Sequence, residues 1–172
     1  GARSGCLTIL YAPQERRVLQ LCQGRSQASA EQLLNQLLAG ETVQAVVMDM
    51  AEPFRQAVKV CCPRALIVAD KFHVLTHVLR ALQRVCQQVQ PEASRDDALL
   101  LRQRALFTAP PLALTVTQRQ QRDRLLATYP RLKVAWQVTQ SFRRIYAASS
   151  RAEAALALER WWQDVCQHGP EP

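Results

Sequence analysis

Two short apolar runs, each followed directly by an aspartate, constrain the fold of this chain most strongly. Residues 43–48 (VQAVVM) precede Asp49, and residues 65–69 (ALIVA) precede Asp70. A continuous apolar run of this length is typical of a strand that is buried on both faces, as in a parallel sheet. Residues 52–60 between the two runs have helical character. The pattern therefore predicts an α/β fold with both aspartates at the carboxyl ends of neighbouring strands.

The segment before these runs predicts an antiparallel hairpin and a helix. Residues 5–12 and 17–22 are β-prone and flank a short turn segment. In residues 29–39 the leucines recur at helical spacing, with Ser29 as the expected N-cap and Gly40 as the expected stop.

After Asp70 the sequence is helical throughout. Apolar residues recur every three or four positions from Lys71 to about Gln90, which indicates one long amphipathic helix. Strand patterns are absent from residue 91 onward. The expected later helices cover about 95–107, 118–128, 130–148 and 151–166. We therefore divide the chain into a strand-containing part, residues 1–90, and an all-helical part, residues 91–172.

The charge of the chain favours a polyanionic partner. The 172 residues include 22 Lys and Arg against 14 Asp and Glu, a formal net charge of +8. Nucleic acid is a common partner of such proteins, although a basic protein that merely stays soluble has the same composition. The sequence contains neither an apolar run of the ~20 residues that span a bilayer nor a signal-peptide pattern, so we expect no membrane partner and a cytoplasmic location.

The two strand-end aspartates are candidates for catalysis and metal binding. Ligands and active sites gather at the carboxyl ends of strands in open α/β sheets, and Mg²⁺ prefers carboxylate oxygens. His73, three residues after Asp70, is positioned to face the same site. The alternative is that both aspartates cap the helices that follow them and that His73 is a structural histidine.

A zinc site at Cys61, Cys62, His73 and His77 is disfavoured. The two cysteines are adjacent rather than separated as in C-x₂-C, and the second histidine lies one helical turn beyond the strand ends.

Residues 46–82 (VVMDMAEPFRQAVKVCCPRALIVADKFHVLTHVLRAL) resemble the core signature of insertion-sequence transposases of the ISL-three group. Further matches occur in the expected order along the chain. Gly24-Arg25 lies before this segment, and Ser141–Tyr146, Arg151 and Trp161 lie after it. The resemblance implies a DDE transposase, in which three acidic residues and two Mg²⁺ ions cut and join DNA. It implies a partial ribonuclease H-like mixed sheet in residues 1–90 and an all-α insertion in residues 91–172. Asp49 then corresponds to the second catalytic acid and metal ligand, while Asp70 and His73 correspond to a supporting Asp-x-x-His element.

The chain departs from the family pattern at two places. The first acid is expected upstream of the hairpin and the third downstream of the helical insertion, and neither is present in this sequence; Glu153 and Glu159 lie within the insertion. We therefore expect weak Mg²⁺ binding and no catalysis by this fragment alone. Two alternatives stay open: a non-catalytic remnant that binds DNA or protein, and a stand-alone ribonuclease H-like nuclease.

The resemblance also implies double-stranded DNA at transposon ends as the partner. The candidate DNA-binding residues are Arg25, Lys71, Arg143 and Arg144, and the aromatic residues near Arg143 are expected to pack in the core. In such a sheet the absent first strand lies between the hairpin and the strand that ends at Asp49. Its absence leaves two open strand edges, so we expect the chain to self-associate.

Overall fold

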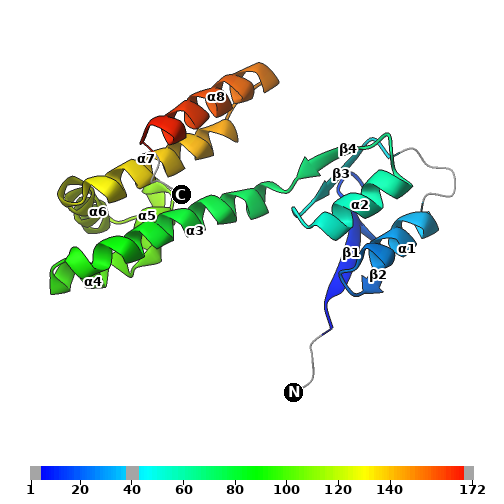
Figure 1. Cartoon of the computed structure of the whole chain (residues 1–172), viewed down its shortest axis with the longest axis horizontal. Coiled ribbons are helices and arrows are strands. Elements are labelled where there is room, and N and C mark those ends of the chain that lie inside the picture. The colour runs from blue at the N-terminus through cyan, green and yellow to red at the C-terminus, as the bar shows by residue number, and fades with distance from the viewer. Residues whose placement is uncertain (1–4, 38–42, 169–172) are drawn as a thin grey trace. The chain divides into compact units, whose positions relative to one another are not determined.

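The computed structural model describes residues 5–37 and 43–168 and shows a mixed α/β chain that is mostly helical (Figure 1). The chain divides into two compact units, Gly1–Val74 and Leu75–Pro172. Among the described residues, no helix has the length and apolar character that a bilayer crossing requires. The α/β class expected from the sequence is therefore confirmed.

The first unit begins with a β-hairpin. Strands β1 (Leu7–Ala12) and β2 (Arg17–Gln23) pair antiparallel, with a bulge between Leu10 and Tyr11. Alternate residues of β1 are half-buried, so one face of the hairpin packs inward. The hairpin predicted from the sequence is confirmed.

A parallel strand pair follows. Strand β3 (Ala45–Met48), helix α2 (Glu52–Cys61) and strand β4 (Leu66–Ala69) form one β-α-β unit, with Met48 opposite Ala69. Both predicted strands and the intervening helix are thus confirmed. Their predicted burial on both faces is wrong, because each strand has exposed residues, among them Val47 of β3 and Leu66 of β4.

The single mixed sheet expected from the sequence is not formed among the described residues. The hairpin and the parallel pair are two separate two-stranded sheets. Each of β1 and β3 pairs on one edge among the described residues, and both strands line one groove without pairing with each other. Without a strand between them, the sheets have no backbone ladder that joins them.

Helix α1 (Gln27–Leu37) packs on α2 to form the core of the first unit. Ala30 and Leu34 are buried against Ala57 and Val58, and the inward side chains of the strands complete the cluster. The expected cap at Ser29 is wrong, because the Ser26 hydroxyl accepts the backbone N–H of Ser29 at 3.1 Å and so occupies the capping position. The expected stop at Gly40 lies outside the described residues.

The second unit is helical. After helix α3 (Lys71–Val89), which starts in the first unit, its elements are η1 (Gln90–Glu92), α4 (Arg95–Leu101), α5 (Arg104–Thr108), η2 (Pro111–Ala113), α6 (Val116–Thr128), α7 (Pro130–Ile145) and α8 (Arg151–His168). The buried face of α3 forms one core cluster with α4, α5, α6 and α7. Because α3 packs this way, the boundary between the compact units falls after Val74, within α3, whereas the sequence placed the domain boundary after residue 90.

The single helix expected at 95–107 is wrong. The chain leaves helical geometry at Gln103 (φ −76°, ψ 84°), which separates α4 from α5. This break lets Leu101 at the end of α4 and Leu106 and Phe107 of α5 all enter the same core, where each is buried.

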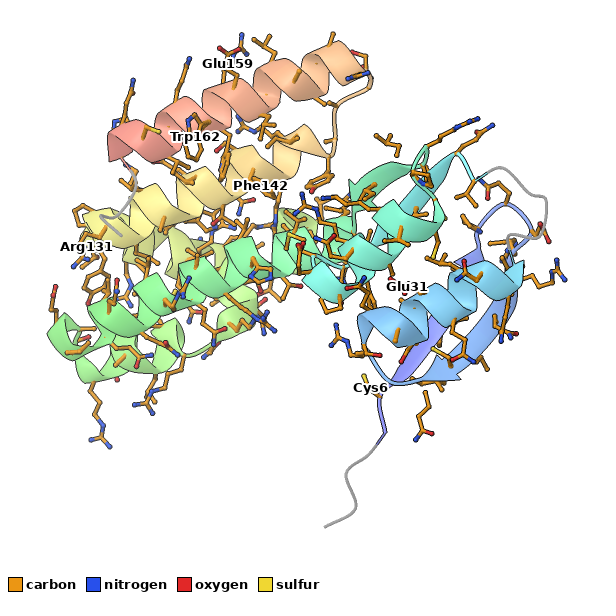
Figure 2. The ribbon with its side chains drawn as sticks, turned by 45° about the vertical axis from the view of Figure 1, so that its right-hand side comes forward. Cys6, Glu31, Arg131, Phe142, Glu159 and Trp162 are labelled. Carbon is orange, nitrogen blue, oxygen red and sulfur yellow. The ribbon has the colours of Figure 1, made fainter. Side chains whose placement is uncertain are left out.

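Helices α7 and α8 form a hairpin that is held by aromatic residues. Phe142 lies on α7 (Figure 2) and is buried. Its ring centroid lies 4.8 Å from that of Trp161 on α8. The indole N–H of Trp161 also donates a hydrogen bond to the carbonyl of Val138 at 3.1 Å. These two aromatic residues therefore pack, as expected, while Trp162 is exposed.

Candidate functional site

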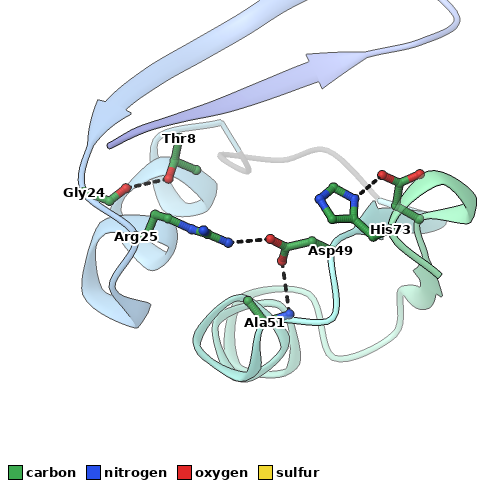
Figure 3. Close-up of polar contacts among 7 residues, drawn as sticks. Thr8, Gly24, Arg25, Asp49, Ala51 and His73 are labelled. Carbon is green, nitrogen blue, oxygen red and sulfur yellow. Dashed lines mark hydrogen bonds and ion pairs between the residues drawn. The ribbon is translucent and has the colours of Figure 1, made fainter. Parts of the chain in front are cut away.

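Asp49 follows β3 directly, and two hydrogen bonds hold its carboxylate in place. Oδ1 accepts the backbone N–H of Ala51 at 3.1 Å, and Oδ2 lies 2.5 Å from Nη2 of Arg25 (Figure 3). Ala51, not Asp49, is the N-cap of α2, and that cap has no side-chain hydrogen bond. The capping alternative for Asp49 is therefore excluded, and its carboxylate stabilises the turn that precedes the helix.

Arg25 is positioned by the end of the hairpin. Gly24 turns the chain with φ 105°, a conformation that favours glycine, and its carbonyl accepts the Thr8 hydroxyl at 2.6 Å (Figure 3). The Arg25 guanidinium lies 5.7 Å from the centre of the Phe54 ring, within cation–π range. The hairpin and α2 thus direct this cation at Asp49.

Asp70 follows β4 directly, at the same end of the parallel strand pair as Asp49, as predicted. Its backbone N–H donates to the carbonyl of Met48 at 2.7 Å, so both aspartates follow paired residues at the same end of the parallel strands. The Asp70 carboxylate lies 2.5 Å from Nδ1 of His73 and accepts the backbone N–H of Phe72 at 3.0 Å. These hydrogen bonds lower the pKa of Asp70, and the one with His73 has the largest effect. Asp70 therefore caps α3, and the capping alternative holds for this residue.

A groove of about 480 Å³ connects these groups in the first unit. It is lined by residues 6–10 of the hairpin, by residues 46–49 at the end of β3 and by apolar side chains of α1 and α2. Arg25, Asp49, His73 and Cys6 are its charged or titratable lining residues. Asp70 does not line the groove, so it acts on the site by holding His73.

The described residues do not make a complete Mg²⁺ site. Asp49 is the one carboxylate among the described residues that line the groove, and it is paired with Arg25. Residues 5–37 and 43–168 contain no group of three or more His, Cys, Asp or Glu side chains that could hold a metal. Since Mg²⁺ takes several oxygen ligands, Asp49 suits it chemically but is insufficient by itself.

The predicted DNA-binding residues occupy different environments. Arg144 is exposed on α7, and Lys71 is exposed at the start of α3. Arg143 is half-buried, and its guanidinium donates to the backbone carbonyl of Thr108, while burial lowers its pKa. Arg143 therefore ties α7 to the end of α5, and Arg25 is engaged by Asp49. DNA contact by these residues stays a prediction.

Comparison with known proteins identifies the family. The model of the ISL-three transposases, described as transposase, matches residues 1–172, the whole chain. The chain belongs to this family. The transposase for insertion sequence element IS1001 of Bordetella parapertussis is 27% identical over 168 residues, which cover 94% of this chain and 41% of that protein. The ISL-three chain therefore spans about two fifths of this relative. No solved structure matches it.

The sequence did not predict the ion pair between Arg25 and Asp49. The two residues are 24 positions apart, and the one available signal was the match of Gly24-Arg25 to the ISL-three pattern.

Proposed function

We propose that this chain is part of the DNA-cleaving domain of an insertion-sequence transposase, with Asp49 as one carboxylate of the active site. The observation that carries the proposal is the position of Asp49 at the end of β3, with its carboxylate at the charged part of the groove. Strand ends of this kind are where α/β enzymes place reacting groups. The family match supports the choice of DNA transposition as the reaction.

The finer fold that we propose is ribonuclease H-like. A further strand between β1 and β3 would join the two small sheets into one mixed sheet, in the order β2, β1, added strand, β3, β4. A groove lined by residues of both β1 and β3 supports this proposal, since each of these strands has one unpaired edge among the described residues. The greater length of the IS1001 relative is consistent with such a strand coming from elsewhere in a transposase.

The residues of this chain have distinct proposed roles. Asp49 would be one of several carboxylates that hold Mg²⁺, and the others would come from outside the described residues. When bound, the metal would activate the attacking oxygen and stabilise the leaving oxygen of the phosphoryl transfer. Arg25 orients the Asp49 carboxylate and balances its charge, and Asp70 fixes the ring of His73 at the groove.

The test is a strand-cleavage and strand-transfer assay with a complete transposase that contains this chain, supplied with its transposon-end DNA and Mg²⁺. We expect Asp49→Asn to reduce both reactions by more than about 100-fold, the upper range for loss of a supporting residue near a metal. Glu15→Gln is the matched control, because Glu15 is an exposed carboxylate that pairs with Arg17 at the hairpin turn. Full activity of Asp49→Asn would exclude the catalytic role and favour the non-catalytic DNA- or protein-binding module.

A further inference from the structure

Helix α3 carries a ridge of polar side chains on the face turned away from its core. His77, Arg80, Arg84 and Gln87 recur at intervals of three or four residues, all four are exposed, and they line a shallow hollow with Gln83. The opposite face of the helix is buried in the core of the second unit. Packing on that side gives the ridge a rigid support.

A second hollow extends this surface toward the junction of α4 and α5. Gln83 and Gln87 line it as well, and Arg102 and Arg104 are among its other lining residues. Both arginines are exposed and flank the break at Gln103. Four arginines therefore border two hollows that share two glutamine side chains, and we call this surface the α3 basic face: Arg80, Gln83, Arg84, Gln87, Arg102 and Arg104.

The charge on this face is uncompensated within the described part of the chain. No carboxylate lines either hollow, and none of the four arginines forms a side-chain hydrogen bond or an ion pair among the described residues. Elsewhere in the same unit arginines are paired, Arg122 with Asp123 and Arg124 with Asp97. A cluster of unpaired guanidinium groups repels itself and is stabilised by a polyanion.

We propose that the α3 basic face binds the sugar-phosphate backbone of double-stranded DNA. From His77 to Gln87 the ridge extends about 15 Å at the helical rise, which matches about four phosphates of one strand at about 3.4 Å each. Arginine fits phosphate oxygens through paired N–H donors, and glutamine amides add neutral donors between them. The face contacts the backbone without reading base sequence. The choice of DNA rests on the proposed function, but the site is separate from the groove at Asp49.

The experiment measures binding of the whole chain to a fluorescent random-sequence 20-base-pair duplex between about 50 and 200 mM salt, where phosphate contacts register strongly. The double variant Arg80→Ala/Arg84→Ala should weaken binding about 10- to 100-fold and reduce the slope of log affinity against log salt by about 2, one for each lost phosphate contact. Arg95→Ala/Arg131→Ala is the matched control. It removes the same charge at two exposed arginines that line neither hollow.

The expected control result is a slope change close to zero. An equal change in both double variants would show that net charge alone drives binding, and tighter binding of poly-glutamate than of the duplex would overturn DNA as the partner. If Arg80→Ala/Arg84→Ala lowers the midpoint temperature of unfolding, a second variant tests the same face. Arg102→Gln/Arg104→Gln changes it at the junction of α4 and α5 and leaves α3 unaltered. Asp49→Asn should keep the full slope, so loss of strand transfer with normal DNA binding separates the two proposals.

Discussion

The Nη2 atom of Arg25 lies 2.5 Å from Oδ2 of Asp49, across 24 residues of sequence. This contact joins the end of the hairpin to the end of the parallel strand pair within the first unit. The Arg25 side chain is 53% exposed and that of Asp49 is 17% exposed, so water screens the pair from one side. An ion pair of this kind orients groups well but contributes little to the free energy of unfolding.

The first prediction is a small coupling energy between Arg25 and Asp49. A double-mutant cycle with Arg25→Met and Asp49→Asn should give about 1 kcal/mol or less, as measured for partly exposed ion pairs. Urea unfolding of the wild type, both single variants and the double variant measures it. A coupling above about 2 kcal/mol would mean that the pair is a principal support of the first unit and not mainly an orienting contact.

The second prediction concerns the unpaired edge of β3. An open strand edge with apolar side chains pairs readily with another chain, so we expect the isolated chain to self-associate in a concentration-dependent way. Val47 on β3 is 62% exposed, and Val47→Lys should shift the chain toward monomer because charge on an edge strand opposes pairing. Size-exclusion chromatography with light scattering measures the shift.

Val60→Lys is the control for this second prediction, since Val60 is 64% exposed on α2 rather than on a strand edge. A wild-type chain that is monomeric at all concentrations, with β3 amides protected from hydrogen exchange, would show that the edge is covered in another way. Equal effects of both lysines would assign any self-association to general surface hydrophobicity.

The strands and the strand-end aspartates were predictable because their signals are local. A continuous apolar run such as residues 43–48 predicts a strand, and an acid directly after it marks the strand end. The burial on both faces that such a run also predicts is wrong among the described residues, because β3 alternates exposed and half-buried side chains. Helical periodicity likewise located α3 and α7 to within a few residues. In these segments the local pattern and the final secondary structure agree, which is the condition under which such predictions succeed.

Apart from the cap of α1, which lies at Ser26 rather than Ser29, the features that were not predicted depend on contacts between distant residues. The break at Gln103 exists because Leu101 and Phe107 both reach a core formed with later helices. The position of Arg25 against Asp49 depends on how the hairpin packs beside α2. The separation of the two sheets depends on which strands are present, and no local pattern reports that.

The third prediction is a change in the pKa of Asp70 when His73 is replaced. The hydrogen bond from His73 is the largest cause that lowers this pKa, so His73→Ala should raise it toward its usual value. Because the folded-state pKa is lowered, the stabilisation is present above the usual pKa of 3.8 and is lost as pH falls through the folded-state value. His73→Ala should therefore reduce how much the free energy of unfolding falls as the pH is lowered from the usual pKa of Asp70 to its folded-state pKa.

Carboxyl-carbon NMR titration measures the Asp70 pKa directly. His77→Ala is the control, because His77 lies one turn further along α3 and makes no hydrogen bond with Asp70 in the described residues. An unchanged Asp70 titration in His73→Ala would show that the Phe72 backbone N–H alone maintains the low pKa.

The final prediction concerns Asp97, a carboxylate within the helical unit that is only 7% exposed. The Tyr129 hydroxyl donates to its Oδ2 at 3.0 Å, and the Arg124 guanidinium bonds its Oδ1. Asp97→Ala would leave the half-buried Tyr129 hydroxyl without its acceptor and would remove a charged hydrogen bond. We expect a loss of about 1–3 kcal/mol in the free energy of unfolding, the range for breaking such a buried contact.

Asp96→Ala is the matched control for Asp97, since Asp96 is the preceding residue in the same helical turn but is exposed. Asp96→Ala should lower the free energy of unfolding by less than about 1 kcal/mol, the usual contribution of a carboxylate near a helix N-terminus. Tyr129→Phe should account for roughly 1 kcal/mol of the Asp97 effect, because it removes one hydrogen bond and keeps the ring. Chemical denaturation measures the free energy of unfolding of all three variants, with one common slope for its dependence on denaturant concentration. Equal losses for Asp96→Ala and Asp97→Ala would show that the first turn of α4 needs its negative charge and that the contacts with Tyr129 and Arg124 contribute nothing further.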